Sequence, residues 1–546
     1  MAAERRETPA KPKMSGQDDS LKETFESIVI AFILAFVFRA YIVEAFVIPT
    51  GSMAPTLLGA HYELRSPDSG YRYDAGPPTG VQSGRRITAN VMPRDVAASD
   101  PMTLLEHRVP RGTRSLPGDR ILVHKYLYFL SEPRRWDVVV FKNPTGPSGQ
   151  AENYIKRLVG KPHEDMHILD GNIYVRPRGE SWQIARKTDR PEVQQAVWQP
   201  IYHSAYVPLP SLSSPIGRDA WAVPWVPDNE GDWDLTGRDA YRYSGSGGDT
   251  LAFDFDAGPY QSGEAMYPYN QFELRRLKLH QRQLQPIEDV RLAATVEALG
   301  DGPVSFELAT TGRWDRLERG DDTRVLRASI DRDGRIVLTA SRPGEARREP
   351  LAEARTRPIV PGQPRRFELW HVDQHLILFD GGRRRAQATV DLSMAELKRR
   401  PPPDPLPEPT LTVGGPALLT AVQLDRDLYY IAGSPPGNVT MTARGGLIRD
   451  GSGRVVDTEP VRLRADEFFC MGDNSPASDD SRYWRGVHPW VEPYFDGAGP
   501  APAGIVPRDL LIGRAFFVYF PSPHRLFGDP GGSVPIPNFG RMRFIH

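Results

Sequence analysis

Apolar and polar residues divide this 546-residue chain into zones of different pattern. An uncharged apolar run, Ser27–Phe38, lies near the start of the chain. Short runs rich in β-branched and aromatic residues, bounded by turn residues, follow between 119 and 176 and return after 455. A second series of alternating runs lies between them, from about 195 to 455. The pattern predicts a mainly β protein with a second β domain inserted into the first.

The N-terminal apolar run has three possible interpretations. At about 12 residues it is shorter than the ~20 that a membrane span needs, but apolar residues resume after Arg39. A cleaved signal peptide would need small residues after the run, where bulky ones stand. A buried core helix is the third possibility, although the run lies near the start of the chain and is apolar on every face. We expect a transmembrane helix over residues 22–42, with residues 1–21 in the cytoplasm and the bulk of the chain outside, following the basic residues before the run.

The expected first domain comprises residues 43–194 and 456–546, on either side of the insert. Its expected strands are Tyr41–Ile48, Asp119–Tyr128, Trp136–Lys142, Tyr154–Gly160, Phe468–Met471 and Leu511–Phe520, with an Asp-Gly hairpin over 166–176. Residues 60–115 are polar with little periodicity, which predicts a surface excursion.

The insert of residues 195–455 shows short strands separated by turns, which predicts an antiparallel sandwich. Its segment FELWHVDQHLILFDGG, residues 367–382, is similar to a strand pair of concanavalin-like jelly rolls. The proline-rich stretch 400–409 is expected to be extended.

Composition narrows the function classes. The net charge is −1 and the pI about 6.9, so no basic excess points to nucleic acid. Cys470 is the single cysteine, which excludes an intramolecular disulfide and a Cys-rich metal site.

Three segments offer chemistry, and each is ambiguous alone. Ser52 stands on a Pro- and Gly-rich turn after a strand, where most serines are turn residues. Lys156 stands in a strand among apolar neighbours, where burial would lower its pKa and let it act as a base. The segment 471–482, MGDNSPASDDSR, suits a surface turn; it lacks the ligand spacing of an EF-hand.

The order of these segments resembles the type I signal peptidase family. The matching blocks are IPTGSMAPTL (48–57), PGDRILVHKY (117–126), WDVVVFK (136–142), YIKRLVGKP (154–162) and GDNSPASDDSR (472–482). The resemblance covers about 150–200 residues in separate blocks. It implies an antiparallel β catalytic core after one membrane helix, and a serine endopeptidase that removes signal peptides.

The resemblance also implies a role for each matching residue. Ser52 is the expected nucleophile and Lys156 the general base, as in other Ser-Lys enzymes. The oxyanion is expected at the Ser52 N–H and the Thr50 hydroxyl. Ser478 is expected to orient the lysine amine. The other expected supporting residues are the ion pair Asp480 and Arg482, Met53 and Pro55 beside the nucleophile, Arg157 beside the lysine, and the turn Gly472, Asp473 and Asn474. Phe46, Ile48, Leu57, Tyr154 and Ile155 are expected to line pockets for small residues of the substrate.

The expected partners are preproteins that carry signal peptides, membrane lipid and, in addition, the secretion machinery. No cofactor, metal or nucleic acid is expected, and the expected location is the cytoplasmic (inner) membrane. Two alternatives stay open: a processing protease of the same clan with a narrow substrate range, and an inactive anchor that presents the sandwich as a binding module.

Overall fold

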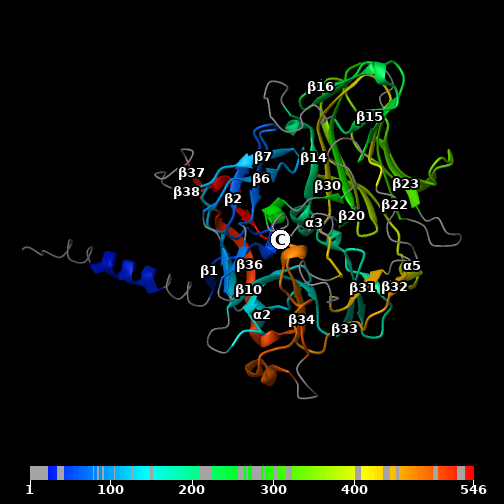
Figure 1. Cartoon of the computed structure of the whole chain (residues 1–546). Helices are drawn as coiled ribbons and strands as arrows, with labels where there is room; N and C mark the ends of the chain where they lie inside the picture. The colour runs from blue at the N-terminus through cyan, green and yellow to red at the C-terminus, as the bar shows by residue number, and fades with distance from the viewer. Residues whose placement is uncertain are drawn as a thin grey trace, which may run out of the picture.

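In the computed structural model, β-strands are the main regular secondary structure of the described residues (Figure 1). The described residues are 22–33, 42–77, 79–82, 85–88, 91–103, 105–125, 127–147, 152–208, 223–255, 264–265, 268–272, 285–286, 289–300, 305–313, 323–399, 407–433, 443–449, 454–495, 502–525 and 535–546. The predicted mainly β class is confirmed. The stretch 400–406, predicted to be extended, lies outside the described residues.

The first sheet joins the two ends of the chain. Its order is β1 (Val43–Val47), β8 (Arg120–Lys125), β36 (Leu511–Phe520), β9 (Val138–Lys142), β10 (Asn153–Gly160), β34 (Glu467–Met471) and β35 (Val506–Pro507), with β39 (Arg543–Phe544) beside β36. All its pairs are antiparallel. Because β36 lies between β8 and β9, the segments before and after the insert form one sheet.

A smaller sheet shares a buried apolar cluster with the first. It contains β11 (Glu164–Leu169), β12 (Asn172–Pro177), β13 (Gln183–Ile184), β31 (Gly446–Arg449), β32 (Val455–Val456) and β33 (Val461–Arg462). Asp170 and Gly171 make the predicted hairpin turn, both with positive φ. β31 runs parallel to β11, an exception to the antiparallel arrangement predicted for the core. β31 also lies within residues 195–455, so this part of the predicted insert pairs with the core.

Residues 60–115 are more ordered than the sequence predicted. They form the hairpins β2 (Tyr62–Arg65) with β3 (Arg72–Ala75), β4 (Thr79–Gln82) with β5 (Arg85–Thr88), and β6 (Val96–Ser99) with β7 (Glu106–Val109). Tyr62, Tyr73, Met92 and Val109 are buried in a small core of their own. The prediction of a plain surface excursion was wrong, because these few apolar residues lie too far apart to show a period.

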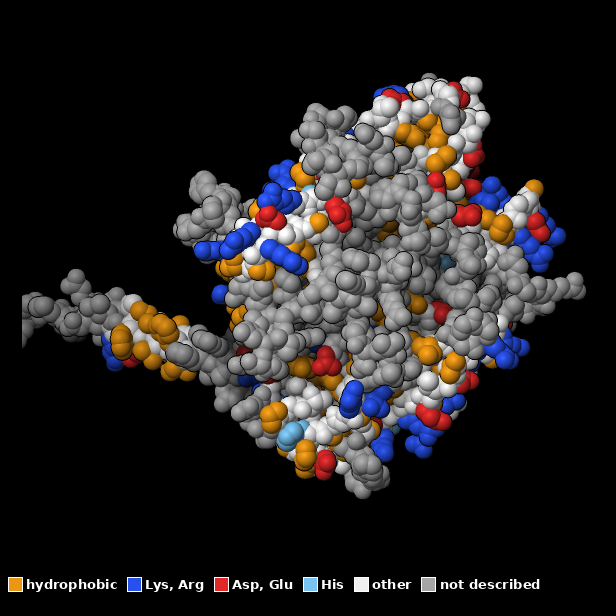
Figure 2. Space-filling view, in the orientation of Figure 1, with side chains coloured by type: hydrophobic (Ala, Val, Ile, Leu, Met, Phe, Trp, Pro, Cys, Tyr) orange, Lys and Arg blue, Asp and Glu red, His pale blue; other side chains and the backbone are white. Residues whose placement is uncertain are grey.

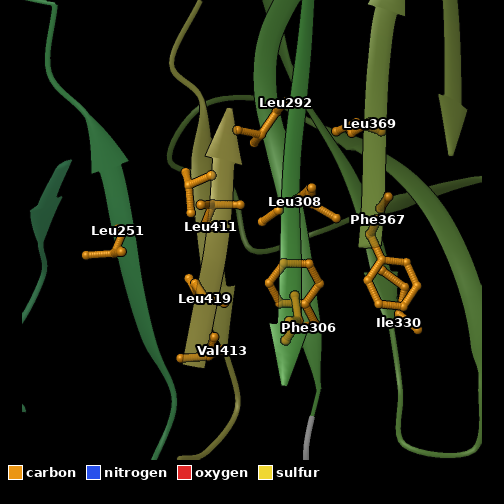
Figure 3. Close-up of a cluster of buried hydrophobic side chains, with 14 of the residues drawn as sticks. Leu251, Leu292, Phe306, Leu308, Ile330, Phe367, Leu369, Leu411, Val413 and Leu419 are labelled. Carbon is orange, nitrogen blue, oxygen red and sulfur yellow. The ribbon is translucent and has the colours of Figure 1, made fainter. Parts of the chain in front are cut away.

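The insert is a sandwich of two antiparallel sheets (Figure 1). One sheet contains β14 (Gln199–His203), β16 (Trp233–Gly237), β17 (Ala240–Tyr243), β30 (Ala417–Arg426), β21 (Val290–Ala298), β26 (Arg365–Val372), β27 (His375–Asp380) and β28 (Arg383–Thr389). The other sheet contains β15 (Trp225–Pro227), β18 (Asp249–Phe253), β29 (Thr410–Val413), β22 (Phe306–Arg313), β23 (Thr323–Ile330), β24 (Arg335–Ser341) and β25 (Glu349–Arg355). Leucines and phenylalanines from both sheets, among them Leu292, Phe306, Leu308 and Phe367, form one buried core (Figure 3).

Short elements complete the described part of the chain. They are the helices α2 (Leu127–Leu130), α3 (Pro191–Val197) and α5 (Met394–Arg399), and the strand pairs β19 (Glu264–Ala265) with β20 (Gln285–Pro286) and β37 (His524–Arg525) with β38 (Pro535–Ile536).

Buried polar contacts hold the sandwich against the core. Lys187, which follows the small sheet, places its Nζ 2.8 Å from Asp373 Oδ1 and 2.9 Å from Asp427 Oδ2 of the sandwich. Since buried charges require partners, the Lys187 contacts fix the relative position of the two units.

The N-terminal helix of the described chain covers residues 22–33. No helix among the described residues is both long and apolar enough to cross a membrane. The structure therefore does not support the predicted membrane helix over 22–42. Residues 34–41, the C-terminal part of that prediction, lie outside the described residues.

Candidate active site

The nucleophile segment begins where β1 leaves the first sheet. Ile48 is the last residue of this segment that bonds to the sheet: its N–H donates a hydrogen bond to the Asp119 carbonyl at 2.9 Å. Residues Gly51–Met53 then form a single 3-10 turn that carries Ser52. The side chain of Met53 is fully buried and anchors the turn in an apolar cluster.

Asp119 holds the far side of the same segment. Its Oδ2 accepts the Leu58 N–H at 3.0 Å, and its own N–H donates to the Leu58 carbonyl at 2.9 Å. Ser522 donates its N–H to Asp119 Oδ1 at 3.2 Å. These bonds make Asp119 a structural residue of the turn.

Lys156 reaches Ser52 from β10. Lys156 Nζ lies 2.8 Å from Ser52 Oγ and 3.1 Å from the Ile155 carbonyl oxygen. The lysine side chain is buried, 4% exposed. Burial lowers the pKa of Lys156 to about 8, although the Asp480 and Asp479 carboxylates act in the opposite direction. An amine with this pKa is neutral in roughly a tenth of molecules at pH 7, far more than an ordinary lysine, and in that form it can accept a proton.

The segment after β34 supports the nucleophile from the other side. Asn474 donates its backbone N–H to the Ser52 carbonyl at 3.0 Å and its side-chain N–H to the Gly51 carbonyl at 2.9 Å. A Cβ on Gly472 would lie 2.3 Å from the Ser52 carbonyl oxygen and 2.2 Å from Ser478 Oγ. Only glycine therefore fits at position 472.

Two buried ion pairs hold this segment. Asp480 and Arg482 are fully buried and make two contacts, Nε to Oδ1 at 2.9 Å and Nη2 to Oδ2 at 2.8 Å. Burial raises the pKa of Asp480, but the Arg482 guanidinium and the Gly472 N–H lower it further, and the net shift is downward. Arg157, next to the lysine, pairs in the same two-point way with Asp473.

Ser478 is buried beside this network. Its side chain is 4% exposed, and it contributes to the lowered pKa of Asp480. Among the described residues its Oγ makes no hydrogen bond to Lys156. Its predicted orienting role remains a prediction.

The residues predicted to line substrate pockets lie around the dyad. Ile48, Leu57 and Ile155 belong to one buried cluster, and the half-buried Phe46 packs against it. Tyr154 lies on the other side, with its ring centroid 5.0 Å from Lys156 Nζ and 6.2 Å from the Trp484 ring. Thr50 and Pro55 are exposed at the surface of the nucleophile segment.

Sequence reasoning missed residues of the insert at this site. Tyr269 and Asn270 contact Gly51 and Asn474, although more than 200 positions separate them from either partner. It also missed Thr56, whose Oγ1 donates to Asp473 Oδ2 at 2.5 Å. The spacing of these residues carries no signal, since the contacts exist only in the folded chain.

A second cluster of charges lies outside the site. Asp289, Asp373 and Asp427 approach one another closely enough to share an ion. The ammonium of Lys187 already lies at Asp373 and Asp427 and supplies the positive charge that they need.

Comparison with known proteins identifies the region that holds Lys156. Residues 112–208 and 420–520 match the model of the signal peptidase family, peptidase S26. The match includes Lys156 and the segment 472–482, and it leaves out the segment around Ser52.

Curated relatives are signal peptidases. The chain is 28% identical over 156 residues to signal peptidase I of Rickettsia typhi, covering 29% of this chain and 44% of that protein. It is 26% identical over 181 residues to signal peptidase I of Buchnera aphidicola subsp. Baizongia pistaciae, covering 31% and 39%. A probable signal peptidase I-2 of Synechocystis is 39% identical over 62 residues, covering 11% and 28%. The matches thus span less than half the length of these relatives.

Solved structures resemble part of the chain weakly. A carbohydrate binding module of Bacillus subtilis, CBM66, has a TM-score of 0.23 at 12% identity, covering 37% of this chain and 96% of that one. A galectin-like protein of unknown function from the same organism has a TM-score of 0.24 at 10% identity, covering 42% and 98%. At these scores the concanavalin-like type of the sandwich stays a prediction.

The family match falls on the core strands on both sides of the insert, and these strands bring Lys156 and the segment 472–482 to Ser52. Over residues 112–208 and 420–520 the chain is similar to the signal peptidase family, peptidase S26.

Proposed function

We propose that this chain is a membrane-bound serine endopeptidase that cleaves N-terminal signal peptides from exported preproteins with a Ser52–Lys156 dyad. The observation that carries the proposal is the 2.8 Å contact between Lys156 Nζ and Ser52 Oγ in a buried site. A serine needs a base within hydrogen-bond reach to become a nucleophile, and this lysine is placed as that base.

The reaction begins with a proton transfer inside the dyad. With the amine neutral, the Ser52 hydroxyl donates its hydrogen bond to the lysine lone pair. As Oγ attacks the scissile carbonyl carbon, its proton passes to Lys156, and the resulting ammonium protonates the leaving amine when the C–N bond breaks. Water then attacks the acyl-enzyme, and Lys156 accepts the proton of the water in the same way.

The negative oxygen of the tetrahedral intermediate needs donors in a fixed position. The Ser52 N–H is one candidate, and the Thr50 hydroxyl, on the exposed approach to the turn, is the other.

The substrate is proposed to bind as an added strand. β1 is the edge of the first sheet, and β10 pairs with β34 only from Arg157 onward. The segment Asn153–Lys156 therefore pairs with β9 alone among the described strands. A peptide between these two edges would meet the apolar walls of Ile48 and Ile155, which favours small side chains next to the cleaved bond.

The proposed location is the cytoplasmic (inner) membrane, with the catalytic domain on its outer side. The helix over 22–33 exposes large apolar side chains, among them Phe25 at 69% and Phe32 at 62%, and Figure 2 shows it covered with hydrophobic atoms. Phe129, Leu130, Phe539 and Phe544 of the catalytic region are also more than 60% exposed. Exposed apolar groups of this size fit contact with lipid. Preproteins, lipid and the secretion machinery are the proposed partners.

The test is cleavage of a synthetic preprotein with an Ala-x-Ala site, in detergent, by wild type, Ser52→Ala and Lys156→Ala. We expect cleavage after the second alanine by wild type and loss of cleavage in both variants. Cleavage that survives Ser52→Ala would disprove the dyad. Wild-type activity confined to one natural substrate would favour the narrow processing protease, and binding by the sandwich without any cleavage would favour the inactive anchor.

A further inference from the structure

The segment Pro268–Phe272 belongs to the inserted region by sequence, and it docks beside the active site. The Tyr269 carbonyl accepts the Gly76 N–H at 2.7 Å, and Gln271 Oε1 accepts the Ser99 N–H at 2.8 Å. Phe272 is buried in the small core of the hairpins 60–115, edge-on to Tyr62 at 6.1 Å. The segment is thus fixed on the hairpins that flank the nucleophile.

Tyr269 covers the residue before the nucleophile. A Cβ built on Gly51 would lie 1.8 Å from Tyr269 Cε1, so the ring rests directly on the Gly51 backbone. The Tyr269 hydroxyl donates to the Ala60 carbonyl at 2.7 Å. The ring therefore joins the two ends of the nucleophile segment.

Asn270 continues this contact toward the nucleophile through Asn474. The two side-chain amides form a reciprocal pair: Asn270 Nδ2 donates to Asn474 Oδ1 at 2.6 Å, and Asn474 Nδ2 donates to Asn270 Oδ1 at 2.8 Å. Both side chains are buried, 5% and 2% exposed. The pair fixes the orientation of the Asn474 side-chain amide. The Asn474 Nδ2 group then also donates to the Gly51 carbonyl, 2.9 Å away.

The Gly51 carbonyl and the Ser52 N–H belong to the same peptide group. In a planar trans peptide these two groups point in opposite directions. Holding the carbonyl against Asn474 therefore directs the Ser52 N–H away from Asn474 and fixes its orientation. The Ser52 N–H is the backbone donor of the proposed oxyanion site.

We infer that Asn270 is a positioning residue for this donor, acting through Asn474 on the Gly51–Ser52 peptide. The inserted region thus supplies part of the support of the active site. The inference rests on the proposed peptidase function and names a residue that the core alone does not contain.

The first test is kinetic. Asn270→Ala should lower kcat about 10- to 100-fold, as expected when a transition-state donor is misplaced, and leave KM within about twofold. Asn270→Asp keeps the volume but sets a carboxylate oxygen against Asn474 Oδ1, so it should lower kcat as well. Asn229→Ala is the matched control, since Asn229 bonds to Asp249 within the sandwich at 2.9 Å, and it should keep the wild-type kcat.

The second test does not depend on cleavage. Hydrogen exchange of the backbone amides in residues 50–54 should be faster in Asn270→Ala than in wild type, and unchanged in Asn229→Ala. Unchanged kcat and exchange in Asn270→Ala would overturn the inference, as would a loss of kcat that accompanies faster exchange throughout the sandwich. If the wild type cleaves nothing, the proposed function fails, and the exchange comparison still decides the role of Asn270.

Discussion

Arg157 and Asp473 form a two-point ion pair across 316 positions of sequence, with Nε to Oδ1 at 2.8 Å and Nη2 to Oδ2 at 2.7 Å. The side chains are 0% and 1% exposed. The pair joins the strand that carries Lys156 to the segment that carries Asn474 and Ser478, and it adds a side-chain link to the backbone pairing of β10 with β34.

Removal of one partner of this pair should destabilise the protein strongly. In Asp473→Ala the Arg157 guanidinium stays buried without its carboxylate, and breaking such pairs costs about 3–5 kcal/mol. Denaturant unfolding measures the loss. Glu353→Ala is the control, because Glu353 pairs with Arg335 at the surface, where both side chains are at least half exposed and such pairs contribute under about 1 kcal/mol. Equal losses in the two variants would contradict the prediction.

Activity should rise with pH. Lys156 acts in its neutral form, and burial lowers its pKa to about 8. As pH increases through this value the neutral fraction grows, so kcat/KM should be half-maximal near pH 8 and level off above it. A pH series with the synthetic preprotein measures this, and Lys142→Ala, which changes an exposed lysine, should show the same profile. A maximum in acid would contradict a lysine base.

The Thr50 hydroxyl is predicted to bind the oxyanion. Thr50→Val keeps the shape of the side chain and removes the donor, so kcat should fall about 10²–10³-fold. Thr50→Ser keeps the donor and should retain activity close to wild type. Thr50→Val and Thr50→Ser together separate the effect of the hydroxyl on kcat from the effect of the methyl group. An equal loss of kcat in both variants would show that packing, and not hydrogen bonding, matters at this position.

Gly472 should not tolerate a side chain. In Gly472→Ala the added Cβ would lie within 2.3 Å of the Ser52 carbonyl oxygen, so the nucleophile must move. We expect a loss of kcat of about 10²-fold, as for other displacements on the order of 1 Å. Gly486→Ala is the control, because no atom lies within 4 Å of a Cβ at Gly486. Retention of activity in Gly472→Ala would contradict the close approach of the two segments.

Much of the fold could be predicted because runs of β-branched and aromatic residues bounded by turn residues mark strands in the sequence. Leu511–Phe520 was predicted with the bounds that the structure shows. Ala417–Arg426, one of the longest strands described, was missed, since it follows a Pro-Gly-rich stretch and its apolar residues do not alternate strictly. The small core of 60–115 was missed for the related reason that its apolar residues are sparse.

The site was predictable to the extent that its residues stand in ordered motifs. These motifs indicated Ser52, Lys156 and the segment 472–482, which the structure brings together. Asn270 and Tyr269 stand in no motif, and their role depends on how the insert folds back on the core. Long-range contacts of this kind leave no period or spacing in the sequence.

The position of β34 has a consequence for the timing of activation during synthesis. Cys470, Asp480 and Arg482 enclose the lysine, and they follow the whole insert in the chain. Until they are made and folded, Lys156 is open to water and keeps the proton of an ordinary lysine. Ser52 is made more than 400 residues before Cys470, Asp480 and Arg482. We therefore expect the nascent chain to cleave no peptide, its own included, until these residues have folded around Lys156. A chain that ends at Pro460 should cleave no preprotein.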